Sequence, residues 1–250
     1  MKNRAYKNYI FDFYGTLIDI LTDEKDPVLW DKLAQLYQAY GADYNGEGLK
    51  KSYAKRVAQT RKELIEIKGV AYPEVDLVHI FNQLYVDGRP QSSNSNQPED
   101  WGQLIAMVLR VLSRKQLLAY PHTKEVLTFL KEQGCRLYLL SNAQAAFTNA
   151  EIDLMELRPY FDAIYLSSDV GICKPQPEFL KQVLDDHGLK PSETVMVGND
   201  LTTDIAVAEA VGIDGILLNT FPYSRRELEK SPIKPDRVIT DIEALKTNFT

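Results

Sequence analysis

The sequence contains a series of short, mainly apolar runs, and each run ends abruptly at a polar or turn-forming residue. Residues 9–11 end at Asp12, and residues 135–140 end at Ser141. The other runs are residues 163–166, 194–197, 215–218 and a short last one at 238–239. Short apolar runs bounded by turn formers are typical of strands that are buried on both faces. The chain is therefore expected to form a buried sheet.

Helical patterns separate these runs. Apolar residues recur at helical spacing over 126–130 and again over 179–184. Gly134, Gly188 and Gly212 each follow a helical pattern and precede a turn or strand, which is the usual position of a helix-ending glycine. Alternation of strand and helix predicts right-handed crossovers. The expected fold class is therefore α/β, with a doubly wound parallel sheet.

One long interval breaks this alternation. Between residues 17 and 120 no convincing strand pattern occurs, whereas connections between strand and helix are usually about 2–6 residues long. Asp26 and Pro27 mark a helix start, and apolar stripes at helical spacing follow, for example over 105–112. We expect an all-helical domain at 18–119, inserted into a core formed by residues 1–17 and 120–250.

Charge and composition restrict the partners of the chain. With 29 basic and 35 acidic side chains, the net charge is −6, which argues against a nucleic-acid partner because such proteins need a basic face. No apolar stretch reaches the roughly 18 residues of a membrane helix, and the first residues lack a signal-peptide core. The two cysteines favour a reducing compartment. A cytoplasmic protein is expected, and any anion that it binds would require a local cation.

Four polar sites are expected to meet at one edge of the sheet, because the carboxyl ends of parallel strands lie together and bind ligands there. The sites are Asp12 with Gly15 and Thr16, Ser141 with Asn142, Lys174, and the segment 198–204 with Asn199, Asp200 and Asp204. Each site alone is as well explained by a cap, a turn or a solvated loop. All four in this order favour a shared functional crevice.

The ordered set resembles the haloacid dehalogenase superfamily of hydrolases, and the resemblance extends from residue 10 to about residue 242. It implies a Rossmann-like core, a helical cap and Asp12 as the nucleophile. It also implies that Thr16, Ser141 and Asn142 hold the transferring group and that Lys174 balances its negative charge. The ligands that it implies for Mg²⁺ are Asp12, the main-chain oxygen of Tyr14, and Asn199 or Asp200, with Gly15 and Asp204 in support.

The chemistry of these residue types agrees with that assignment. A carboxylate that attacks a phosphoryl group meets electrostatic repulsion, which a bound Mg²⁺ and an ammonium group would offset. Attack would produce an acyl phosphate, which water then cleaves. Mg²⁺ prefers oxygen ligands and retains several waters, so two or three protein oxygens suffice. The first hypothesis is therefore a Mg²⁺-dependent phosphatase of a small phosphorylated metabolite.

Two residues depart from the phosphatase pattern. Tyr14 stands where those enzymes usually carry a second Asp that protonates the leaving alcohol, and Asn199 stands where Asp is usual. Losing a positioned general acid costs about 10²–10⁴-fold in rate. Dehalogenases of the superfamily tend to have Tyr at this position. They need neither an acid nor a metal, because a halide leaves as a stable anion. Two features argue against a dehalogenase. Leu180 stands where that branch would have Tyr, and the segment 198–204 is acidic. A dehalogenase and a weakly active or non-catalytic phosphate-binding protein stay open as alternatives.

Overall fold

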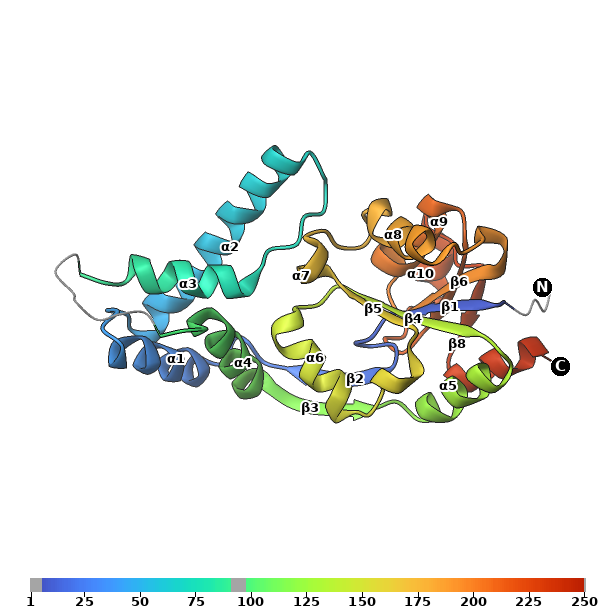
Figure 1. Ribbon diagram of the computed structural model, residues 1–250, viewed down its shortest axis with the longest axis horizontal. Coiled ribbons are helices and arrows are strands. Elements are labelled where there is room, and N and C mark those ends of the chain that lie inside the picture. Colours follow the sequence, from blue (N-terminus) through green and yellow to red (C-terminus); the bar gives the residue numbers. More distant parts are fainter. Residues whose placement is uncertain (1–5, 91–97, 250) are drawn as a thin grey trace.

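The computed structural model describes residues 6–90 and 98–249, and its main feature is a six-stranded parallel sheet (Figure 1). The strand order is β5-β4-β1-β6-β7-β8. The strands are β1 (Asn8–Phe11), β4 (Arg136–Ser141), β5 (Ala163–Leu166), β6 (Thr194–Gly198), β7 (Asp214–Leu218) and β8 (Arg237–Ile239). All six strands expected from the apolar runs are present, so the predicted α/β class is confirmed.

Helices cover both faces of this sheet, because side chains of each strand alternate between two apolar clusters. Phe11 and Leu139 pack on one face, and Ile10 and Leu140 pack on the other. The first face is covered by α5 (Thr123–Glu132), α6 (Ala145–Leu154) and the 3₁₀ helix η4 (Ile242–Phe249). The second face is covered by α8 (Pro177–His187) and α9 (Ala206–Val211). The sheet is therefore buried on both sides, as parallel sheets usually are.

A second apolar core lies in the inserted region. It joins α1 (Pro27–Ala39), α2 (Gly46–Lys68), α3 (Leu77–Asp87) and α4 (Trp101–Ser113). Asp26 caps α1 as expected, because its carboxylate accepts a hydrogen bond from the Val28 N–H over 2.9 Å. Trp101 is fully buried in this cluster, where its ring forms a T-shaped contact with that of Tyr37. The four helices form a unit that we refer to as the cap.

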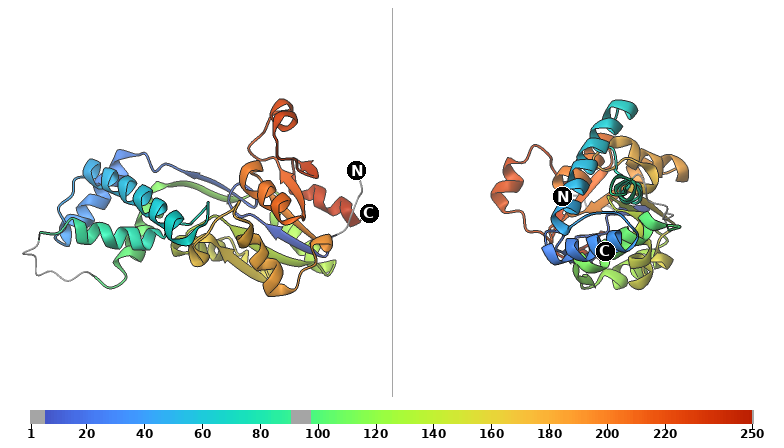
Figure 2. Two further views of the ribbon diagram at one scale, coloured as in Figure 1. Left: turned by 90° about the horizontal axis from the view of Figure 1, so that it is seen from above. Right: turned by 90° about the vertical axis from the view of Figure 1, so that its left-hand side faces the viewer.

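The expectation that residues 18–119 contain no strand is wrong. Strands β2 (Ile18–Thr22) and β3 (Arg114–Ala119) pair antiparallel, with Ile18 opposite Ala119. Each strand is short and half-buried, and its partner lies about a hundred residues away, so neither had a strong local pattern. The two-stranded ribbon joins the cap to the sheet (Figure 1), and in Figure 2 it runs between α1–α3 at one end of the molecule and η4 at the other. The exact division into two domains stays a prediction.

A second connection ties the cap to the core. Residues 72–74, between α2 and α3, bond to residues 171–173, which follow the short helix α7 (Ser167–Val170). Cys173 donates its N–H to Tyr72 over 3.0 Å, and Glu74 donates to Gly171 over 3.1 Å. Lys174 comes directly after this contact.

None of the helices in the described ranges is both long and apolar enough to cross a bilayer.

Candidate active site

Asp12 lies at the carboxyl end of β1, between the ends of two neighbouring strands. The preceding residue, Phe11, is in register with Leu139 of β4 and Val197 of β6. The Asp12 N–H donates to the Val197 carbonyl over 2.9 Å. Only 7% of Asp12 is exposed. The strand order changes direction between β1 and β6, and such switch points are where doubly wound sheets bind ligands.

Lys174 lies beside Asp12 in a fully buried position. Its ammonium donates three hydrogen bonds of 2.7 Å each, to Asp12 Oδ1, to Asp204 Oδ1 and to the Leu140 carbonyl. Burial by itself would lower the pKa of Lys174, but the carboxylates of Asp12 and Asp204 outweigh that effect and raise it. Lys174 therefore stays charged, and each of the three N–H groups of its ammonium is engaged in one of these hydrogen bonds.

Asn142 holds the main chain of Lys174 with both ends of its amide. Its Oδ1 accepts from the Lys174 N–H over 2.7 Å, and its Nδ2 donates to the Lys174 carbonyl over 2.9 Å. The sequence predicted that Asn142 binds the transferring group. In the structure its side chain lines the crevice but is engaged with Lys174, so it also positions the ammonium.

The loop after Asp12 packs closely against Asn199. Gly15 has φ +80°, and a Cβ there would come within 2.5 Å of Asn199 Nδ2, so this position needs glycine. The Thr16 hydroxyl lies 3.3 Å from Asp12 Oδ2 and 3.2 Å from Asn199 Oδ1. Gly15 and Thr16 thus connect the loop after β1 to the loop after β6.

The acidic residues after β6 have different partners. Asp200 caps the π-helix η3 (Leu201–Ile205): its Oδ1 accepts the N–H groups of Thr202 and Thr203. Asp204 is buried against Lys174, and its Oδ2 accepts the Asp200 N–H over 3.1 Å. Burial raises the pKa of Asp204 to about 6, against the opposing effect of the Lys174 charge.

These side chains surround a pocket of about 200 Å³ at the carboxyl edge of the sheet. Its lining is Asp12, Tyr14, Ser141, Asn142, Lys174, Asn199, Asp200, Thr203 and Asp204. The lining includes seven residues that were predicted from the sequence to catalyse, to bind the transferring group or to hold the metal. Thr16, whose hydroxyl contacts Asp12, is not among the lining residues, and neither is Gly15. Thr203 lines the pocket without having been assigned a role from the sequence.

Tyr14 belongs to a buried polar cluster that sequence reasoning missed. Its hydroxyl donates to Glu151 of α6 and lies 3.1 Å from the Thr148 hydroxyl. Glu151 is 3% exposed. Its carboxylate also accepts hydrogen bonds from Nε and Nη2 of Arg110 over 2.8 Å each, and one from Arg114 over 2.9 Å. Burial raises the pKa of Tyr14 well above its usual range. No local pattern in the sequence indicates this cluster, because its members come from four separate segments: the loop after β1, α4, β3 and α6.

The donor set of the pocket fits a magnesium ion. The pocket offers the side-chain oxygens of Asp12, Asn199 and Asp200 and no sulfur or imidazole among its lining residues, which is the chemistry that Mg²⁺ prefers. Three carboxylates face one ammonium there, so the lining carries an excess of negative charge that a divalent cation would offset. Tyr14, whose main-chain carbonyl completes the predicted set, is also among the lining residues.

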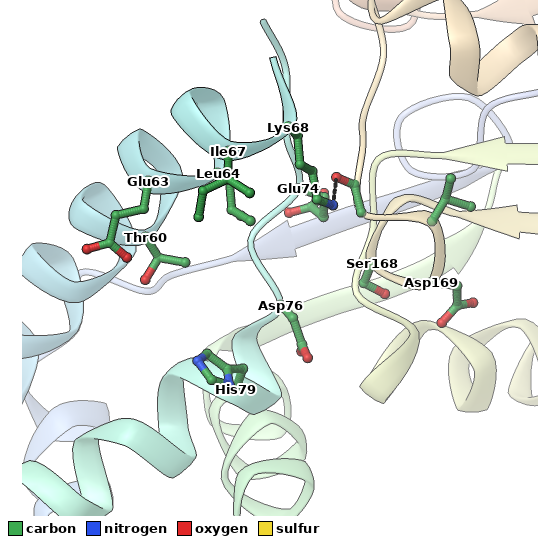
Figure 3. Close-up of a pocket in the computed structure, with 12 residues that line it drawn as sticks. Thr60, Glu63, Leu64, Ile67, Lys68, Glu74, Asp76, His79, Ser168 and Asp169 are labelled. Atoms are coloured by element: carbon green, nitrogen blue, oxygen red, sulfur yellow. Dashed lines mark hydrogen bonds between the residues drawn. The ribbon is translucent and has the colours of Figure 1, made fainter. Parts of the chain in front are cut away.

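A larger pocket of about 500 Å³ lies at the junction of cap and core and shares none of these residues (Figure 3). It is formed by the carboxyl-terminal half of α2, the start of α3, and α7. The Lys68 ammonium donates a hydrogen bond of 3.0 Å to the Gly171 carbonyl, which Figure 3 marks with a dashed line. None of the predicted site residues lies here, so the predicted chemistry is confined to the smaller pocket.

Comparison with known proteins agrees with the family predicted from the sequence. The family model of haloacid dehalogenase-like hydrolases matches residues 6–212. The chain is 33% identical over 132 residues to a glyceraldehyde 3-phosphate phosphatase of Methanothermobacter thermautotrophicus, a match that covers 52% of this chain and 58% of that protein. The chain thus spans little more than half the length of this curated relative.

Two solved structures share the fold over almost the whole chain. A phosphatase of the same family from Thermococcus onnurineus superposes with a TM-score of 0.63 at 19% identity, covering 97% of each chain. A 2-haloacid dehalogenase from Pseudomonas syringae superposes with a TM-score of 0.64 at 19% identity, covering 98% of each chain. Fold similarity alone therefore does not separate the two chemistries.

Proposed function

Because the chain belongs to the haloacid dehalogenase-like hydrolases, we propose that it is a phosphatase that hydrolyses a small phosphorylated metabolite through Asp12. The observation that carries this proposal is the 2.7 Å contact between the Lys174 ammonium and Asp12 Oδ1. That contact places a buried cation beside a carboxylate at the edge of a polar pocket. A nucleophilic carboxylate needs such a cation, because it must approach an anionic phosphoryl group.

The reaction proceeds in two steps. An Asp12 carboxylate oxygen attacks phosphorus, and the bond from phosphorus to the leaving oxygen breaks with its electron pair on that oxygen. Water then attacks the phosphorus of the aspartyl phosphate and gives up a proton to solvent, which releases inorganic phosphate and the Asp12 carboxylate. Lys174 neutralises charge during both steps. Ser141 and Asn142, at the end of β4, orient the phosphoryl group, and Thr16, in the loop after β1, assists through its contact with Asp12.

Mg²⁺ is the proposed cofactor. When bound, it would offset the charge of the phosphoryl oxygens and orient them toward Asp12. Asp12, the main-chain oxygen of Tyr14, and the side chain of Asn199 or Asp200 would hold it. Asp204 supports the site from behind, since it contacts both Lys174 and the Asp200 N–H.

Hydrolysis of a carbon–halogen bond is the second candidate, and one observation favours it. The Tyr14 hydroxyl donates to Glu151, so it is not available to protonate a leaving group, and a halide needs no proton. The acidic residues Asp200 and Asp204 oppose this candidate, because a leaving halide would be repelled by their charge.

A parallel assay separates these activities. Phosphate release from a panel of small phosphate esters, with and without Mg²⁺, is measured beside halide release from 2-chloropropionate. We expect Mg²⁺-dependent phosphate release and no halide. Halide release alone would identify a dehalogenase, and neither product would identify a binding protein.

The variant Asp12→Asn is the control for the covalent step. The amide has the same shape, and its oxygen can still accept from Lys174, but it is not nucleophilic. We expect turnover to be abolished while the circular dichroism spectrum stays unchanged. More than a few per cent of residual activity in the purified variant would contradict the proposed role of Asp12.

A further inference from the structure

The lining of the small pocket contains no side chain with a proton to give to a leaving oxygen. No histidine occurs among its described lining residues. The three N–H groups of Lys174 are all donated to Asp12, Asp204 and the Leu140 carbonyl. Both oxygens of Asp204 accept hydrogen bonds, from Lys174 and from the Asp200 N–H, so neither is left to carry a proton toward a substrate. Asp200 accepts three hydrogen bonds at one oxygen, and the hydroxyls of Ser141 and Thr203 are too weakly acidic to replace a carboxylic acid.

Tyr14 is the remaining candidate, and the structure shows where its hydroxyl is engaged. It donates to Glu151 and lies 3.1 Å from the Thr148 hydroxyl. Glu151 and Thr148 are 3% and 0% exposed, and neither lines the pocket. The phenol therefore points out of the pocket into the α6 side of the core, although other atoms of Tyr14 belong to the pocket wall.

Two arginines fix this arrangement. Arg110 forms a two-pronged ion pair with Glu151 over 2.8 Å, and its guanidinium lies 4.8 Å from the centre of the Tyr14 ring. Arg114 donates to the same Glu151 carboxylate over 2.9 Å. To aim the Tyr14 hydroxyl at a substrate, the ring would have to give up its bond to a buried carboxylate held by both arginines.

From this geometry we infer that the enzyme acts on phosphorylated substrates whose leaving group departs unprotonated, as a weakly basic anion. Acyl, enol and aryl phosphates have such leaving groups, whereas phosphate esters of simple alcohols do not. Glu151 is the positioning residue in this inference, because it acts through the Tyr14 hydroxyl and does not touch the substrate. The inference rests on the proposed phosphatase function and narrows its substrate class.

A series of substrates of similar shape tests this. The wild-type protein is assayed with Mg²⁺ on 4-nitrophenyl, phenyl and cyclohexyl phosphate, whose six-membered rings are similar in size but whose leaving groups differ widely in basicity. We expect kcat/KM for the cyclohexyl ester to be lower than for the phenyl ester by about 10²–10⁴-fold, the contribution that a positioned general acid would otherwise make. Acetyl phosphate, an acyl phosphate, should react at least as well as the nitrophenyl ester.

The variant Tyr14→Phe decides whether the hydroxyl takes part. Phenylalanine keeps the ring and its contacts with Phe13 and Arg110, and removes only the oxygen. Whatever its effect on the overall rate, we expect the dependence of kcat/KM on leaving-group basicity to keep the wild-type slope. A steeper slope in Tyr14→Phe would show that the hydroxyl protonates the leaving oxygen and would overturn the inference.

The outcomes separate this inference from the proposed function. Comparable wild-type rates on phenyl and cyclohexyl phosphate would overturn the inference and leave a phosphatase. Release of phosphate from none of the four compounds would overturn the proposed function and the inference with it. A steep slope that is unchanged in Tyr14→Phe supports both.

Discussion

The Lys174 ammonium donates to Asp12 over 2.7 Å, although 162 positions separate the two residues in the chain. The same ammonium bonds to Asp204, which is 1% exposed. One buried cation therefore serves two buried carboxylates. Removing it would leave both without a counter-charge, so we expect Lys174 to matter for stability as well as for the proposed catalysis.

The variant Lys174→Met keeps most of the apolar stem and removes the charge. We expect kcat/KM to fall by about 10²–10³-fold, the usual effect of losing one electrostatic contact to a transition state. The free energy of unfolding should fall by about 3–5 kcal/mol, because a buried ion pair loses one partner. Steady-state kinetics and urea denaturation measure the two effects.

The double variant Lys174→Met, Asp204→Asn is the control for this prediction. It removes one of the two uncompensated carboxylates, so it should recover part of the lost stability and none of the lost activity. Recovery of activity together with stability would mean that Lys174 acts only on the fold.

Mg²⁺ binding is expected to depend on Asp200. Because a ligand that binds only the folded protein raises its stability, added Mg²⁺ should raise the Tm of the wild type, and the rise should be absent in Asp200→Asn. Asparagine retains the side-chain oxygen that caps η3, so the Tm without Mg²⁺ should change little. Differential scanning fluorimetry without any substrate measures this.

Asp241→Asn is the matched control for the metal experiment. Asp241 also accepts a main-chain N–H at the start of a helix, from Glu243 over 2.8 Å, but it is exposed and lies outside the pocket. This variant should keep the full Mg²⁺-dependent rise in Tm. Loss of the rise in both variants would show that it reflects general charge effects.

Tyr14→Asp should introduce the proton donor that the pocket lacks. The aspartyl side chain is much shorter than tyrosine, so it should not reach Glu151 and should stay beside the pocket. At saturating Mg²⁺ we expect kcat/KM to rise most for cyclohexyl phosphate and little for 4-nitrophenyl phosphate, because only the first needs protonation. An equal effect on both esters would contradict this explanation.

The pH dependence of stability should report on Glu151. Burial would raise its pKa, but the hydrogen bonds from Arg110 and Tyr14 outweigh burial and lower it from 4.5. A lowered carboxyl pKa contributes stability above pH 4.5 that is lost as the pH falls through the folded-state value. Glu151→Gln should therefore cost about 3–5 kcal/mol at pH 7, and the difference from wild type should shrink below pH 4.5.

A control on the same helix isolates the effect of burial. Asp153 of α6 pairs with Arg158 at the surface, so Asp153→Asn should change stability little at any pH, because exposed ion pairs are screened by solvent. Thermal denaturation of both variants between pH 3 and pH 7 makes the comparison. A difference for Glu151→Gln that stays constant below pH 4.5 would contradict the assignment.

The sequence by itself determined the parallel sheet and the edge at which polar residues gather. Each strand is a local apolar run, and each of the four sites follows a strand or precedes a helix, so position along the chain was enough to bring Asp12, Ser141, Lys174 and Asp200 together. The capped start of α1 at Asp26 and the glycine that ends α8 are also local features. Such features depend on the residue types and backbone geometry of a few neighbouring positions.

Only the tertiary structure decided what each polar group bonds to. Asn142 is engaged by the main chain of Lys174, and the Tyr14 hydroxyl is engaged by Glu151, which Arg110 of α4 and Arg114 of β3 hold in place. The β2–β3 ribbon likewise joins segments about a hundred residues apart. These contacts have no period or spacing in the sequence, because they form between side chains that meet only after the cap has folded back onto the core.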